Sequence, residues 1–204
     1  MRRGLRYVPL FAALAIPLGS PEPWLHLKYS NKPQNQVSFG SEGLGIQVTK
    51  SASPLLYKLA QPREVTAITA EGYVSAFPDL EPRDYALRLG LVTEGSRTLN
   101  WFQKLFASEW VKQLVELAPG KGFGKIHFYV LSQGKEVGER RILSEGDAME
   151  ETIAASQTQP GDFTLAYAVT PPSTVSAVWL QSDGDDSQTT FAVKLQKLTL
   201  TTPD

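Results

Sequence analysis

The sequence predicts a mainly β protein, an antiparallel β-sandwich or jelly roll, from three observations. Short runs rich in Val, Thr, Tyr and Phe recur along the chain, and Pro, Gly, Asp or Ser bounds each of them. Helical segments do not alternate with these runs, as they would in a protein with a parallel sheet. The 204 residues suffice for one domain with a sizeable core, and are too few for two ordinary domains.

The expected strands follow one another at short spacing from residue 44 onward. In the last of them, Phe191, Val193 and Leu195 share one face. Leu198 and Leu200 rejoin that face only if one extra residue is inserted after Leu195, so we expect a β-bulge there. The expected strands are 44–50, 54–60, 64–77, 84–92, 124–132, 139–144, 162–170, 175–182 and 189–201.

One segment has the helical period instead. Its apolar side chains recur at three- and four-residue steps, and Pro119 and Gly120 follow them. We expect one inserted amphipathic helix over about 97–118 that closes an open end of the core, with a lid or a membrane-binding helix as the alternative. Its polar face lacks the Lys/Arg-rich character of a membrane-surface helix. The apolar positions are Leu99, Phe102, Phe106, Trp110, Leu114 and Leu117.

The N-terminus has the pattern of an export signal. The basic stretch "MRRGLRY" precedes the apolar stretch "VPLFAALAIPLG", which is too short for a settled membrane span. Cleavage sites are offered at Ala13-Leu14-Ala15 and at Gly19-Ser20, and an uncleaved membrane anchor is the alternative. We therefore expect a signal peptide at 1–20, an irregular lead-in at 21–43 and a single β-sandwich domain at 44–204. The expected location is periplasmic or secreted, with no membrane span after cleavage.

Composition excludes several classes of function. The formal net charge of −1 shows no excess of basic residues of the kind that nucleic-acid-binding proteins carry. The absence of cysteine excludes disulfides, thiolate zinc sites, iron–sulfur clusters and cysteine nucleophiles. His26 and His127 are the only histidines, so a multi-histidine metal site is excluded as well.

Arginines on strand faces are candidates for ligand binding. Alternation over 84–92 places Arg88 opposite a core face, on the same side as the small residues Ala86 and Gly90. Such an arginine forms either a structural pair with a carboxylate or an anchor for an acidic or hydroxylated ligand. Arg140 and Arg141 lie on opposite faces of 139–144, so one of them shares a face with apolar neighbours and needs a partner. The expected core face of 84–92 holds Tyr85, Leu87, Leu89 and Leu91.

The stretch "SDGDDS" at 182–187 places Asp183, Asp185 and Asp186 between two expected strands. It does not fit a calcium-binding EF-hand loop, because Gln188 stands at the glycine position and Lys194 at the bidentate glutamate position. Asp, Gly and Ser do form good turns, since their side chains bond the local backbone and they tolerate tight backbone angles.

Three carboxylates in one turn repel each other unless a positive group lies near them. We expect Arg88 and Arg141 to supply that charge. The alternative is a Ca²⁺ ion bound at Asp183 and Asp185.

Three segments, "DYALRLGLV", "FYVLSQGKEVGERRILSEG" and "VSAVWLQSDGDDS", carry a family resemblance. In that order they resemble three signatures of a family of exported bacterial proteins known as a domain of unknown function (number three-zero-four-seven). The resemblance implies a jelly roll similar to galactose-binding-type domains and export to the periplasm, and it implies no activity. The matching residues are Asp84, Ala86, Arg88, Glu139, Arg140, Arg141, Asp183, Asp185, Asp186 and Ser187.

The sequence favours an exported, non-catalytic binding or structural protein of the cell envelope, of a carbohydrate-binding kind. The expected partner is a glycan or another polar envelope ligand, with no cofactor apart from the Ca²⁺ alternative. A hydrolase that cleaves a glycan through the carboxylates at 183–186 is the alternative function. The candidate binding residues are Asp84, Arg88, Arg141, Trp179, Asp183, Asp185 and Asp186.

Overall fold

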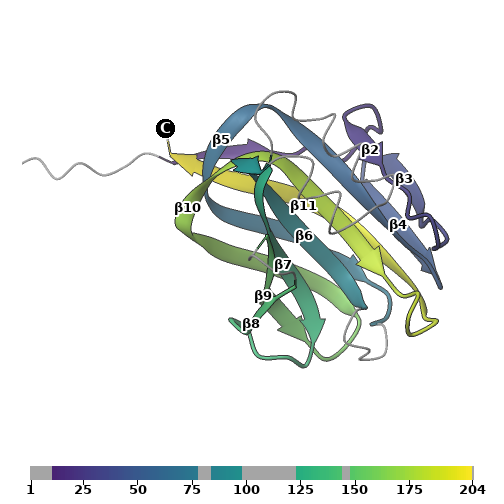
Figure 1. Cartoon of the computed structure of the whole chain (residues 1–204). Coiled ribbons are helices and arrows are strands. Elements are labelled where there is room, and N and C mark those ends of the chain that lie inside the picture. Colours follow the sequence, from purple (N-terminus) through teal and green to yellow (C-terminus); the bar gives the residue numbers. More distant parts are fainter. Residues whose placement is uncertain (1–10, 78–83, 98–122, 144–147, 204) are drawn as a thin grey trace, which may run out of the picture.

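The computed structural model describes residues 11–77, 84–97, 123–143 and 148–203, and strands dominate these ranges (Figure 1). None of the described residues is helical, and none belongs to a helix that could cross a membrane. The strands are β1 (Phe11–Ala15), β2 (Trp24–His26), β3 (Gln36–Gly40), β4 (Gly43–Thr49), β5 (Ala52–Val74), β6 (Tyr85–Arg97), β7 (Phe123–Gln133), β8 (Arg140–Ile142), β9 (Met149–Gln157), β10 (Gly161–Asp183) and β11 (Thr190–Pro203).

The strands form one continuous sheet that folds over on itself. Its order is β3-β4-β11-β5-β10-β6-β7-β9-β8, with β1 beside β11 and β2 beside β5. Strands β5 and β10 have 23 residues each and run through both halves of the sheet. Residues 67–74 of β5 pair with β11, whereas its residues 52–58 pair with the part of β10 that joins β6. The two halves are the two layers of a β-sandwich (Figure 1).

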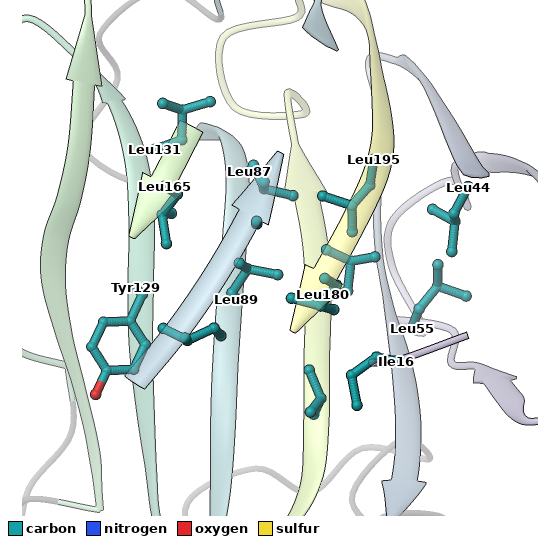
Figure 2. Close-up of a cluster of buried hydrophobic side chains, with 14 of the residues drawn as sticks. Ile16, Leu44, Leu55, Leu87, Leu89, Tyr129, Leu131, Leu165, Leu180 and Leu195 are labelled. Atoms are coloured by element: carbon teal, nitrogen blue, oxygen red, sulfur yellow. The ribbon is translucent and has the colours of Figure 1, made fainter. Parts of the chain in front are cut away.

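The core lies between these layers. Leu44 and Leu195 reach it from β4 and β11, while Leu89 and Leu180 reach it from β6 and β10 (Figure 2). All four are almost completely buried, and burial of such side chains stabilises the fold by about 1.5–3 kcal/mol each. A mainly β sandwich was the sequence-based prediction, and the described residues confirm it.

Finer parts of that prediction need correction. The sheet is mixed and not purely antiparallel, because β7 and β9 pair in parallel. The helix expected over about 97–118 falls outside the described residues, except for Arg97, which ends strand β6. Strands β2 and β3 lie within 21–43, which was expected to be irregular. Segments 54–60 and 64–77 form one strand, because the Gln-Pro-Arg stretch between them does not end the pairing with β10.

The bulge expected in the last strand is present. Leu195 is opposite Gly72 in β5, whereas Lys197 is opposite Glu71, so Gln196 is the extra residue. Leu198 consequently returns to the buried face that holds Leu195. The hydrophobic spacing of the sequence alone was enough to locate this irregularity.

The N-terminal segment adds a strand and part of the core. The residues of β1 pair with the end of β11 and are largely exposed. Ile16 and Leu18, by contrast, are only 4% and 6% exposed and belong to the central core. The indole nitrogen of Trp24 donates to the carbonyl of Pro17 at 2.7 Å, which fixes this entry segment. Among the described residues the fully buried core side chains therefore begin at Ile16, and Leu14 of β1 packs partly buried against the same core.

A pair of truncations tests that boundary. Removal of residues 1–15 should change the melting temperature little, because the described residues it deletes form only an edge strand. Removal of residues 1–20 should destabilise the protein by several kcal/mol, since it deletes two buried side chains worth about 1.5–3 kcal/mol each. Urea unfolding of both variants measures the difference, and equal stability of the two would contradict the assignment.

Candidate ligand-binding site

A pocket of about 340 Å³ lies over β6, β7 and β10, on the side of this layer away from the central core. Its floor is apolar and includes Phe128 and Trp179, whose rings meet edge to face at 6.1 Å. Polar groups converge on it from β6, β8, β9, β10 and the segment after β2. A pocket of this size that combines an apolar floor with a few convergent polar groups is typical of small-ligand sites.

Arg88 reaches the pocket from β6. Its guanidinium lies flat over the Phe128 ring, 3.7 Å from the centroid, and Nη1 donates to the Tyr85 hydroxyl at 3.1 Å. The place that a side chain at Gly90 would occupy is filled by the ring of Phe128 and the Cβ atom of Trp179. Gly90 is thus required for the aromatic floor.

Tyr85 was expected on the core face, and that prediction is wrong. Gln181 is opposite Arg88, but Asp183 is opposite Tyr85, so β6 has one more residue than β10 in this interval. This bulge turns Tyr85 onto the same side as Arg88. It also lets Ala86 and Leu87 both enter the central core.

Glu151 holds both candidate arginines. Arg88 Nη2 lies 3.2 Å from one of its carboxylate oxygens, and Arg141 Nη2 lies 2.6 Å from the other. Arg141 stands directly opposite Glu151 in the β8–β9 pair, so the register of two neighbouring strands makes this contact. Glu151 is 7% exposed and the Arg88 side chain is 13% exposed, so their charges are largely shielded from water.

Gln181 connects the aromatic floor to the acidic turn. Its Oε1 accepts hydrogen bonds from Trp179 Nε1 at 3.0 Å and from the Tyr29 hydroxyl at 3.2 Å. These two donors fix the orientation of the amide, and its nitrogen donates to Asp183 Oδ2 at 3.2 Å. Burial raises the pKa of the Tyr29 hydroxyl, so Tyr29 stays a donor at ordinary pH.

The acidic turn is compensated by lysine and by backbone donors. Lys32 Nζ lies 2.6 Å from Asp185 Oδ1. Asp84, the residue before β6, accepts hydrogen bonds from the backbone nitrogen of Ser187 at 2.7 Å and from its hydroxyl. Asp84 therefore ties the start of β6 to the turn between β10 and β11.

The pKa values of two carboxylates at this turn shift in opposite directions. Burial raises the pKa of Asp183 to about 8, and a hydrogen bond with Asp185 adds to the increase. Burial would also raise the pKa of Asp185, but its hydrogen bonds with Asp183 and Lys32 outweigh burial and lower that pKa.

The structure brings four of the candidate residues to one pocket, namely Arg88, Arg141, Trp179 and Asp183. Asp84 and Asp185 adjoin it, whereas Asp186 is exposed. The expected pairing of arginines with aspartates is wrong. Among the described residues Arg88 and Arg141 pair with Glu151, and Asp185 pairs with Lys32. Trp179 is 2% exposed, so it forms part of the floor and is no exposed platform.

Sequence reasoning missed Glu151, Gln181, Lys32 and Tyr29. Glu151 lies in "MEETIAASQ", which forms strand β9 and pairs with β7 on one edge and β8 on the other. The polar first half of this segment gave no strand signal. Gln181 continues the face of Trp179 at a spacing of two, and this alternation was the one available signal. Lys32 and Tyr29 come from the segment expected to be irregular and carry no local signal.

A larger and more open hollow of about 680 Å³ lies over β3, β4 and β11. It exposes Tyr73, which stands between Lys194 and Asp162 in the sheet. Its charged residues Glu42 and Lys194 already pair with each other. The Arg88 pocket differs, because it contains buried polar atoms that lack hydrogen-bond partners among the described residues.

No family model and no curated protein matches the chain, so membership of the family named above stays a prediction. Solved structures with a related arrangement include the family 29 carbohydrate-binding module CBM29_1 from Piromyces equi, at a TM-score of 0.42 and 7% identity over 94% of this chain and 91% of that one. The xylan-binding module CBM15 gives 0.41 and 8% over 94% and 96%.

The enzymatically active domain of tailspike protein 4 from bacteriophage CBA120 gives a TM-score of 0.42 and 6% identity. That match covers 91% of this chain and 20% of the tailspike chain.

The bridge through Glu151 leads to a stability prediction. Glu151→Gln removes the carboxylate that pairs with the largely buried Arg88 guanidinium and should cost about 3–5 kcal/mol of unfolding free energy. Glu71→Gln is the matched control, because Glu71 pairs with Lys197 at an exposed site and should matter by less than about 1 kcal/mol. Chemical denaturation of both variants makes the comparison, and a Glu151→Gln variant as stable as the control would refute the bridge.

Proposed function

We propose that the protein is a non-catalytic binding module that holds a hydroxylated, glycan-type ligand in the Arg88 pocket. The observation that carries the proposal is the Nε atom of Arg88, a buried donor with no hydrogen-bond partner among the described residues. The other two nitrogens of this guanidinium are fixed by Tyr85 and Glu151. A buried donor left open in an otherwise complete network is expected at a functional position.

The surroundings of this donor suit a sugar. A hydroxyl group both donates and accepts hydrogen bonds, so it matches a site that presents the donors of Arg88 and Arg141 beside the acceptor oxygens of Glu151. The apolar floor at Phe128 can contact the C–H face of a sugar ring. The planar arginine fork adds directional recognition that a lysine would not provide.

Glycan hydrolysis is less well supported. Glycosidases place their two carboxyl groups about 5–5.5 Å or 6.5–9.5 Å apart. Asp84, Asp183 and Asp185 offer oxygen atoms that all lie within 4.8 Å of one another. Asp84 is further committed to Ser187, and Asp185 to Lys32. This packing leaves little room for a glycosidic bond between two of these carboxylates.

Binding of glycans tests the proposal directly. Calorimetry with a panel of neutral and acidic oligosaccharides should find a ligand whose affinity falls at least tenfold in Arg141→Ala and in Arg88→Lys, because both lose directed donors in the pocket. Arg63→Ala is the control, since Arg63 is an exposed arginine of β5. Binding that survives both pocket variants but is lost in Tyr73→Ala would move the site to the hollow over β3, β4 and β11, and an absence of glycan binding would reject the proposal.

We further propose that the chain is exported and that the mature protein begins at Ile16. The A-x-A sequence at 13–15 precedes the first buried residue of the core, whereas cleavage after Ser20 would remove Ile16 and Leu18. Intact-mass analysis of the periplasmic or secreted protein should therefore give Ile16 as the first residue. A mature chain that begins at Pro21, or that retains Met1, would contradict this proposal.

A further inference from the structure

We propose that Asp84, Asp183 and Asp185 form a binding site for a hard divalent cation, Ca²⁺, at the edge of the pocket. The site adjoins the pocket, because Asp183 lines it whereas Asp84 and Asp185 do not, and a test with Ca²⁺ alone separates the two proposals.

The three carboxylates come from three different places in the chain. Asp84 precedes β6, Asp183 ends β10 and Asp185 lies in the turn that leads to β11. Each offers an oxygen atom, and these atoms all lie within 4.8 Å of one another. Convergence of three acidic side chains from separate elements requires the fold to hold them against their mutual repulsion. Proximity alone does not establish a site, so the state of each oxygen matters.

Asp183 provides the second observation. It is 5% exposed, and its Oδ1 is a buried oxygen that receives no hydrogen bond from a donor among the described residues. Its other oxygen receives the amide of Gln181, which Trp179 and Tyr29 hold in one orientation. Metal-binding carboxylates are oriented by hydrogen bonds of this kind from a second layer of residues. Asp183 is thus held in one orientation, while one of its buried oxygens receives no donor from the described residues.

The local charges also leave room for a cation. Lys32 is the positive side chain in contact with the cluster, through Asp185, while Arg88 and Arg141 are bound to Glu151. Within the described part of the chain, three ionised carboxylates would therefore face one ammonium group. A divalent ion would balance the remaining charge.

The donor set selects the type of ion. All three donors are carboxylate oxygens, which suit Ca²⁺ and Mg²⁺, whereas zinc and copper prefer nitrogen or sulfur ligands. Ca²⁺ accepts irregular geometry, which fits carboxylates brought together from a strand start, a strand end and a turn. Mg²⁺ demands a near-ideal octahedron, so we expect Ca²⁺ to bind more tightly than Mg²⁺.

Titration of the full chain, freed of metal with EDTA and dialysed, tests the site with CaCl₂ alone as the probe. We expect saturable binding by calorimetry, with a dissociation constant of about 10⁻⁴–10⁻³ M or tighter, together with a rise in melting temperature. Bound Tb³⁺ should give luminescence sensitised by the tyrosines of the pocket. Asp183→Asn should weaken Ca²⁺ binding more than tenfold, whereas Asp186→Asn, at the exposed aspartate of the same turn, should bind like the wild type.

A lysine variant gives a second readout that does not depend on removing a carboxylate. Lys32→Met should tighten Ca²⁺ binding several-fold, because it removes a positive group that contacts Asp185. Lys194→Met, which alters a lysine in an exposed pair, is the control. No Ca²⁺ binding at millimolar concentration, equal binding by Asp183→Asn, or weaker binding by Lys32→Met would each overturn the proposal.

Discussion

The pairing of β5 with β10 is the constraint on which the rest of the structure depends. The two strands remain neighbours from Gly161 opposite Val74 to Asp183 opposite Ala52, with two interruptions in register. Every other strand attaches to one of them, either directly or through intermediate strands. Both strands pass through both layers. The register of this one pair therefore determines which side chains face the central core and which face the pocket on the outer side of one layer.

A small irregularity in that register creates the site. Where β10 meets β6, the extra residue in β6 places Tyr85 beside Arg88 and brings Asp183 alongside Tyr85. In a regular ladder Tyr85 would point into the central core and leave Arg88 without its hydroxyl partner. Bulges commonly re-aim side chains at the ends of strands next to functional sites, and this one links the arginine end of the pocket to its acidic end.

The sequence predicted local patterns well and long-range partners poorly. Alternation found most of the long strands and the extra residue at Gln196, because period-two burial is a local property. It also singled out Arg88 and Arg141 as charges that needed partners. The sequence assigned these arginines to aspartates, which is wrong. The parallel pairing of β7 with β9 brings Glu151 to both of them instead. Which carboxylate meets which arginine depends on strand order, and local spacing carries no information about strand order.

The division of charge in the pocket has a consequence for its chemistry. Had Asp183 paired with Arg88, the two would have neutralised each other and left an inert, buried ion pair. Glu151 instead takes both arginines, so Asp183 is held by the neutral amide of Gln181 and keeps one oxygen without a hydrogen-bond partner among the described residues. Arg88 likewise keeps its Nε without such a partner. The fold therefore leaves a buried donor at the arginine end of the pocket and a buried carboxylate oxygen at its acidic end, where a direct pair of Arg88 with Asp183 could have satisfied both.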